Sequence, residues 1–424
     1  MYPKNLCYKY KNTLGFSLNH TKLLLILIIS SRVCSIAIRV IVVTKFITKG
    51  DFMSKEIIEK VQKLAQNFVA PITQSVDKEG RFPKEAYDEL KKQGFMGLLV
   101  PKEFGGVGGS IVEHTQICYE LAKKDATTGL CYMMHNTASA CLVGFGSDSM
   151  KQEFLPKIAK GEIALALAYS ESGSGTHFNA PDITEKIEGE YRILTGRKSF
   201  VTSALNADYY LTNTNSCKVQ GAQNNWLVDR TSPNLIHEES AWNGLGMRGN
   251  SSMPVKYEGV KINEQFLIGK EGEFGEQAPL ELAYFVSGLA AVYTGLASAA
   301  YQCVLDYTKS RKYTSGQALT DIEMVKVHLA EIYTKVQSSL ALVYEAAKSF
   351  KAEEADCVAK IFASRINATN NVMEVCTLAM RLGGGNAYAK RLPLERYMRD
   401  CLASQVMAPS LDVLKIWLGD ALVK

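Results

Sequence analysis

The sequence of 424 residues lacks the features that mark membrane-spanning, disulfide-rich or zinc-binding proteins. Arg32 and Arg39 break the apolar runs near its start, so none reaches the roughly 18 to 20 residues that a spanning helix needs. The 10 cysteines are scattered, without a CxxC pair or a His at ligand spacing, which argues against a zinc site, any other metal centre or a disulfide framework. Internal repeats are also missing. The class that remains is an ordinary globular protein, long enough for two or three domains.

The positive charge lies almost entirely in the first part of the chain. Residues 1–52 hold eight Lys and Arg against one Asp, a net charge of +7, whereas the whole chain carries +5. Residues 53–424 therefore carry −2 and have no basic excess for a polyanion. We expect no nucleic-acid partner.

Residues 1–52 form a leader that fits no standard targeting signal. It has no clear signal-peptidase site, and its Ser-poor, Ile-rich composition suits a transit peptide badly. Residues 49–53, Lys-Gly-Asp-Phe-Met, are what a purine-rich ribosome-binding site and a start codon would encode if translated in frame. We expect translation to start at Met53 and a bacterial, cytoplasmic protein, in preference to membrane or organelle targeting. A nucleotide sequence without a purine-rich tract before codon 53 would contradict this.

The spacing of apolar residues divides the rest of the chain into three regions. Residues 53–164 show helical spacing, with helices expected at Lys84–Gln93, Ser110–Lys124 and His135–Gly146. In residues 165–272, short runs separated by Gly, Asn, Asp and Ser clusters predict a β domain.

Helical spacing returns in residues 273–424 with almost no proline. Four long segments joined by short loops predict a four-helix bundle. These segments are Ala283–Arg311, Thr320–Ala352, Glu354–Leu382 and Pro393–Met407. The predicted fold class is α+β: a helical domain, a β domain and a helical bundle, in that order.

Three motifs follow one another in these regions. Residues 168–176 read Ala-Tyr-Ser-Glu-Ser-Gly-Ser-Gly-Thr, and Ser199–Ser203 reads Ser-Phe-Val-Thr-Ser. Near the end, Leu382-Gly-Gly-Gly-Asn-Ala-Tyr388 precedes Pro393-Leu-Glu-Arg-Tyr-Met-Arg-Asp400. Together they resemble the acyl-CoA dehydrogenase superfamily, across essentially all of residues 53–424. The resemblance implies FAD as cofactor and a barrel-like middle domain.

The resemblance also implies which residues hold the flavin. Backbone and hydroxyl groups of a Gly-rich strand end suit the edges of a flavin ring, because glycines allow close approach and hydroxyls bond without charge. An Arg fork suits its pyrophosphate, here in the adjacent subunit of a homotetramer or homodimer. The implied cofactor contacts are Tyr169, Ser170, Thr176, Phe200, Thr202, Arg311, Gly384, Gly385, Ser410 and Asp412, with Thr176 and Ala408 facing substrate. Ser170, Ser172 and His177 depart from the family's usual Thr, Pro and Asp.

The catalytic base is where the chain departs most from the family. Dehydrogenation requires a Glu that takes the α-proton of the acyl thioester. The usual position reads Ala408, and the alternative position on a bundle helix reads Phe285. Glu281 lies one helical turn before Phe285, on roughly the same face, and His135 lies on a helix that faces the pocket in the family. Glu281 and His135 are therefore the candidate substitutes.

Three functions stay open from these residues. The first is α,β-dehydrogenation of an acyl-CoA thioester in fatty acid metabolism, with electrons passed to an electron-transferring flavoprotein. The second is a two-component flavin monooxygenase or amine oxygenase on the same fold, served by a flavin reductase. The third is an acyl-CoA-binding flavoprotein without catalysis. The resemblance favours the first.

Overall fold

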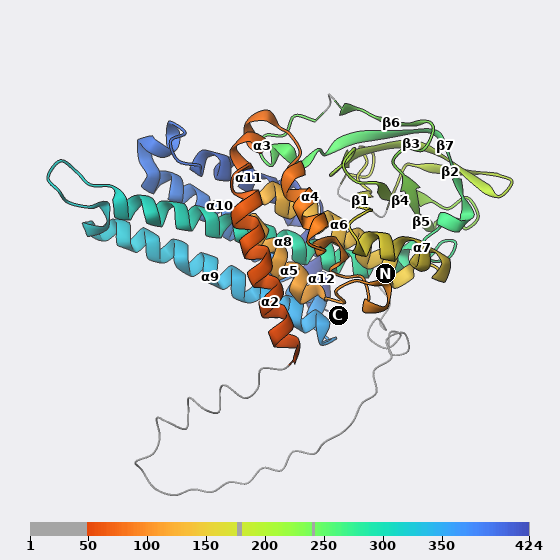
Figure 1. The fold of residues 1–424 in the computed structure, drawn as a ribbon, viewed down its shortest axis with the longest axis horizontal. Helices are drawn as coiled ribbons and strands as arrows, with labels where there is room; N and C mark the ends of the chain where they lie inside the picture. The colour runs from red at the N-terminus through yellow and green to blue at the C-terminus, as the bar shows by residue number, and fades with distance from the viewer. Residues whose placement is uncertain (1–48, 176–179, 240–241, 424) are drawn as a thin grey trace, which may run out of the picture. The chain divides into compact units, whose positions relative to one another are not determined.

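A computed structural model describes residues 49–175, 180–239 and 242–423 (Figure 1). The leader prediction for residues 1–48 lies outside these residues, as do Thr176 and His177 of the Gly-rich loop. The chain divides into two units, residues 1–57 and 58–424. The fold below is that of the second unit.

The first helices follow the caps that the sequence provides. Ser110 caps helix α5 (Ile111–Ala122) in a capping box, in which its backbone N–H donates to Glu113 Oε2 across 2.9 Å. The Asp125 carboxylate accepts from Thr128 N across 2.8 Å and caps α6 (Ala126–Phe145). This helix therefore begins well before the expected His135. The other helices of this region are α2 (Lys49–Leu64), of which residues 58–64 belong to this unit, α3 (Thr73–Glu79), α4 (Lys84–Lys92) and α7 (Asp148–Ala159).

The middle region contains two sheets among the described residues. One has the order β1-β4-β5, with β1 parallel to β4, and the other is antiparallel in the order β2-β3-β7-β6. Their shared core includes Trp226, Tyr210 and Tyr257. The strands are β1 (Leu165–Ala168), β2 (Thr184–Glu188), β3 (Tyr191–Val201), β4 (Tyr209–Asn215), β5 (Gln223–Asp229), β6 (Leu235–His237) and β7 (Met253–Asn263).

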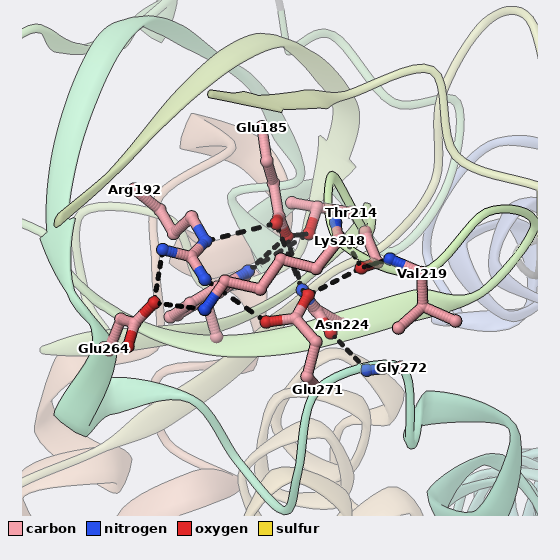
Figure 2. A network of polar contacts seen from close by, with 11 residues as sticks. Glu185, Arg192, Thr214, Lys218, Val219, Asn224, Glu264, Glu271 and Gly272 are labelled. Atoms are coloured by element: carbon pink, nitrogen blue, oxygen red, sulfur yellow. Dashed lines mark hydrogen bonds and ion pairs between the residues drawn. The ribbon is translucent and has the colours of Figure 1, made fainter. Parts of the chain in front are cut away.

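A polar network fixes the turn that leads from this region into the bundle (Figure 2). Arg192 on β3 has a fully buried side chain and ion-pairs with Glu264 and, at 3.3 Å, with Glu271. Asn224 on β5 donates to Glu271 Oε1 across 2.7 Å and accepts from Gly272 N across 2.7 Å. Both sheets therefore hold the residues just before the first bundle helix.

Long helices make up the last region. Ile111, Val286, Ala346, Phe362 and Leu414 come from five different helices and share one core. The helices of this region are α8 (Phe274–Ser310), α9 (Glu323–Lys351), α10 (Cys357–Tyr388), α11 (Leu394–Val406) and α12 (Leu411–Leu422), and α10 packs along both α8 and α9 (Figure 1). Helix α8 is long and apolar enough to cross a membrane, but 78% of that stretch is buried inside the protein, as in the core helix of a bundle.

The predicted order of helical, β and helical regions is confirmed. Helix α8 begins at Phe274, ahead of the expected Ala283, with Pro279 inside it. Strand β3 is a single strand from Tyr191 to Val201, and its pairing with β7 shifts register after Leu194 and again after Lys198.

Candidate active site

A cavity of about 520 Å³ opens where the middle region meets α6, α8 and the turn between α11 and α12. Residues at the ends of β1 and β3 and residues on helices α6, α8 and α11 contribute to its lining. The residues that line it are Met134, Thr137, Leu167, Tyr169, Ser170, Glu171, Ser172, Gly175, Phe200, Thr202, Trp242, Gly246, Met247, Asn250, Ser252, Glu281, Leu282, Phe285, Ala403, Val406, Met407, Ala408 and Pro409.

Four of the predicted flavin contacts meet in this cavity. Tyr169 and Ser170 follow β1, while Phe200 and Thr202 lie at the end of β3. The Ser199 backbone N–H donates to Ser170 O across 2.7 Å, which joins the two segments. Two motifs that are 30 residues apart in the sequence thus form one wall.

All three positions considered for an acidic base also line the cavity. Ala408 and Phe285 leave both family positions without a carboxylate, while Glu281 brings one to the same space. Glu281 is only 3% exposed.

Only one of the two carboxylate oxygens of Glu281 has hydrogen-bond partners among the described residues. The Tyr169 hydroxyl donates to Glu281 Oε1 across 2.5 Å, and Asn225 Nδ2 donates to the same oxygen across 3.1 Å. Glu281 Oε2 is buried and has no hydrogen-bond partner among the described residues. A buried carboxylate oxygen without a partner is costly. The arrangement leaves one oxygen available to a group that enters the cavity.

Burial controls the proton affinity of this carboxyl. Burial raises the pKa of Glu281, while the neighbouring Cys141 thiol and the hydrogen bonds from Tyr169 and Asn225 act in the opposite direction. The Cys141 thiol is itself deeply buried, which raises its pKa well above its ordinary value and keeps it neutral. A carboxyl with a raised pKa is a stronger base once ionised, as proton abstraction requires.

His135 is not brought to the cavity, which corrects its place among the candidate bases. It is fully buried on α6, where Nε2 donates to Met96 O (2.9 Å) and Nδ1 accepts from Leu165 N (3.0 Å). Burial lowers the pKa of His135 to about 4. With both ring nitrogens engaged, it ties α6 to β1 and has no free lone pair.

The cavity wall fits a planar, largely uncharged ring system. The Phe200 side chain is 61% exposed beside the cavity, which is unusual for a large apolar residue on a strand. Thr202 and Ser252 share a 2.7 Å hydrogen bond and present hydroxyl groups to the same wall. Gly175 leaves open space where a Cβ would stand. Aromatic surface, neutral hydroxyls and open backbone are what an isoalloxazine ring would contact.

The residues assigned to the pyrophosphate lie elsewhere, at one end of the bundle. Arg311 is exposed just after α8, and its backbone N–H donates to Tyr307 O. Asn386 donates to the Tyr307 hydroxyl across 2.8 Å, which brings the exposed Gly384 and Gly385 to the same end. Gly384 has φ 52° and ψ −138°, a conformation that glycine allows, and kinks α10 there. Neither Arg311 nor these glycines line the cavity.

Two further cofactor assignments lie beside the cavity. Ser410 is the N-cap residue of α12, directly after the cavity residue Pro409. The Asp412 side chain is 90% exposed in the first turn of that helix. Their contacts to a cofactor stay predictions.

The sequence analysis missed the residues that surround Glu281. Asn225 lies in the middle of β5 and is fully buried, and its Nδ2 also lies 3.1 Å from Gln277 Oε1 and 2.9 Å from the Tyr169 hydroxyl. Cys141 Sγ contacts the same Gln277 oxygen at 3.6 Å. The available signal was the pair Asn224-Asn225 inside a buried strand, where polar side chains need partners.

The fold and cavity define a flavin-dependent oxidoreductase with a helical, a β and a helical region. Three family descriptions match in that order: the acyl-CoA dehydrogenase N-terminal domain over residues 53–162, the middle domain over 166–260 and the C-terminal domain over 284–422. The chain belongs to the acyl-CoA dehydrogenase family. Membership of this family supports FAD as the cofactor, in agreement with the resemblance.

Individual relatives agree with this assignment. A short-chain specific acyl-CoA dehydrogenase from Clostridium acetobutylicum is 28% identical over 365 residues, covering 84% of this chain and 94% of that protein. A chain from the structure of the electron transferring flavoprotein of Acidaminococcus fermentans is 26% identical with a TM-score of 0.84, covering 90% of this chain and 99% of that chain. PigA, solved with FAD and proline, shares the fold at 20% identity and a TM-score of 0.81, covering 89% of this chain and 98% of that chain.

Proposed function

We propose that the protein catalyses α,β-dehydrogenation of an acyl-CoA thioester, with Glu281 as the base. The observation that carries this proposal is Glu281, which lines the cavity together with Ala408 and Phe285 and whose buried Oε2 has no hydrogen-bond partner among the described residues. In this chain the base would reach the substrate from α8, one helical turn before the bundle-helix position that other members of the superfamily use.

The roles of the residues follow from the chemistry of the reaction. Bound FAD supplies a two-electron acceptor for the hydride that leaves the β-carbon. Glu281 Oε2 takes the α-proton, and the electrons of the broken α-C–H bond form the double bond between the α- and β-carbons. We assign polarisation of the thioester carbonyl to the backbone N–H of Ala408, because this group does not depend on the missing Glu side chain. Phe200 and the hydroxyls of Thr202 and Ser252 would hold the ring.

Electrons would then leave to an electron-transferring flavoprotein. The 26% identity to a chain from the Acidaminococcus fermentans electron transferring flavoprotein structure supports this partner. We also propose a homotetramer or homodimer in the cytoplasm of a bacterium, in which Arg311, Gly384 and Gly385 reach the cofactor of an adjacent subunit. A monomer with full flavin content in analytical ultracentrifugation would contradict this assembly.

An oxygenase reaction is the second candidate, and Ala408 is the observation that favours it. Neither family position carries a carboxylate in this chain, since one reads Ala408 and the other Phe285. In this respect the chain resembles the flavin monooxygenases and amine oxygenases of the superfamily. Under this reaction the partner would be a flavin reductase.

One anaerobic experiment separates the two. A panel of acyl-CoA thioesters is added to the oxidised, FAD-loaded protein, and the visible absorbance of the flavin is followed. Bleaching by at least one thioester is expected. If none bleaches the flavin, and product forms only when reduced flavin and O₂ are supplied, the oxygenase reaction replaces dehydrogenation.

A further inference from the structure

We propose that Tyr169 and Asn225 are positioning residues that fix Glu281 Oε1, so that Oε2 stays turned to the reacting part of the cavity. This inference rests on the proposed function of Glu281. It gives a role to Asn225, to which the family resemblance assigns none, and a second role to Tyr169, which the resemblance makes a flavin contact.

The three side chains close a triangle of hydrogen bonds. Tyr169 lies at the end of β1, Asn225 in β5 and Glu281 in α8. The distances are 2.5 Å from the Tyr169 hydroxyl to Glu281 Oε1, 3.1 Å from Asn225 Nδ2 to the same oxygen, and 2.9 Å from Asn225 Nδ2 to the Tyr169 hydroxyl. The Tyr169 ring also packs edge-on against Phe274, with centroids 5.6 Å apart. Rotation of the carboxylate would break two hydrogen bonds in a buried site, where their loss is costly.

Strand β5 also fixes the helix on which Glu281 lies. Asn224, the neighbour of Asn225, accepts from Gly272 N across 2.7 Å. Gln277 on α8 donates to Ile268 O across 2.6 Å, and its Oε1 lies 3.1 Å from Asn225 Nδ2. The backbone before Glu281 and its side chain are therefore both held from adjacent residues of one strand. A base placed this way needs little reorganisation at the moment of proton transfer.

Few titratable groups face Glu281, so a shift in its titration midpoint can be assigned to the hydrogen bond that a variant removes. They are Tyr169 after β1 and Cys141 on α6, together with the neutral amides of Asn225 on β5 and Gln277 on α8. Among the described residues no Lys, Arg or His is hydrogen-bonded or ion-paired to this carboxylate in the structure. Burial raises the pKa of Tyr169 well above its ordinary value, so its hydroxyl stays a donor.

A hydrogen bond to the ionised carboxylate favours the ionised form. Removing the Tyr169 hydroxyl therefore raises the pKa of Glu281, and the ionised, active base appears only at higher pH. For Tyr169→Phe we expect the acid limb of the pH–rate profile to move upward by about one pH unit. At a pH below that limb, this shift lowers the rate about tenfold.

The test uses two variants and a matched control in the FAD-loaded protein. Tyr169→Phe and Asn225→Leu each remove a hydrogen-bond donor to Glu281. If Tyr169→Phe does not fold, Asn225→Leu still tests the proposal. Tyr257→Phe is the control, because the Tyr257 hydroxyl makes a buried 2.8 Å hydrogen bond with Thr212 and the residue does not line the cavity. Flavin content and thermal unfolding are measured for each protein.

Two readouts are taken for each protein. One is the pH dependence of anaerobic flavin bleaching by an acyl-CoA that bleaches the wild type. The other is the infrared carbonyl stretch of protonated Glu281, identified as the band that Glu281→Gln lacks, followed from low to high pH. We expect both midpoints to rise in Tyr169→Phe and Asn225→Leu and to stay in place in Tyr257→Phe.

The possible failures can be told apart. If the infrared midpoint rises and no acyl-CoA bleaches the flavin, the positioning role stands and the proposed function falls. An infrared midpoint that is unchanged in both variants, at normal flavin content, overturns the positioning role. A midpoint that moves equally in Tyr257→Phe also overturns the positioning role, because the shift then reflects a general loss of packing in the protein.

Discussion

The Tyr169 hydroxyl donates to Glu281 Oε1 across 2.5 Å, joining the end of β1 to helix α8 inside the cavity. This bond links the wall that the flavin motifs form to the Glu281 carboxylate, which lines the same cavity as Ala408 and Phe285. A chain that lacks Glu at both family positions thereby keeps an acidic group beside its reaction space. The predictions below follow from this arrangement.

A carboxylate restored at residue 408 should replace Glu281. In Glu281→Gln, adding Ala408→Glu should recover anaerobic flavin bleaching by at least about tenfold, because a positioned general base contributes roughly 10²- to 10⁴-fold. Gln405→Glu is the control, since it adds the same charge on α11 at a residue that does not line the cavity. An inert double variant that still binds acyl-CoA would show that residue 408 does not face the α-carbon.

Asp400 should make stability depend on pH. It is 2% exposed and accepts from Met247 N, and burial raises its pKa from 3.8 to about 7. Since the folded-state pKa lies above the unfolded value, the favourable contribution is complete below about pH 4. It is lost as the pH rises through about 7, by up to roughly 1.4 kcal/mol for each pH unit.

Asp400→Asn should flatten this slope, because an amide oxygen keeps the bond from Met247 N and does not titrate. Urea unfolding at pH values from 4 to 8 measures the slope, with the exposed Asp306→Asn as control. An unchanged slope in Asp400→Asn would show that another group dominates this pH range.

Arg192 should be needed for the middle region. Its side chain and that of Glu185 are both fully buried, 3.8 Å apart. Arg192→Leu leaves the Glu185 charge buried without its ion-pair partner, so we expect a loss of about 3–5 kcal/mol in the free energy of unfolding. The matched control is Arg197→Leu on the same strand, whose ion pair with Glu238 is largely exposed and worth below about 1 kcal/mol. Equal losses in the two variants would contradict this assignment.

Local signals in the sequence predicted much of the fold. Ser110 predicts the start of its helix, and the short runs begin near Leu165, where the first strand of the middle region begins. The start of α8 was placed too late, because Pro279 and the polar residues before Ala283 read as a loop. The turn before that helix is held by Arg192 and Asn224 from other parts of the chain, and such support leaves no local pattern in the sequence.

The candidate site was predicted in part. The Gly-rich loop and the strand around Phe200 pointed to one wall of the cavity, and helical spacing placed Glu281 near the face of Phe285. Whether Glu281 reaches the cavity depends on the Tyr169 and Asn225 hydrogen bonds, which connect residues more than 50 positions apart. His135 looked equally suitable by residue type, but tertiary packing uses both of its ring nitrogens.

The most direct test of the account is anaerobic flavin bleaching by an acyl-CoA in wild type and Glu281→Gln. The amide preserves shape and can still accept from Tyr169 and Asn225, so binding of the thioester should be nearly unchanged while the bleaching rate falls roughly 10²- to 10⁴-fold. Glu276→Gln, at an exposed position of the same helix, should behave as wild type. A Glu281→Gln protein that bleaches at the wild-type rate would contradict the assignment of Glu281 as the base.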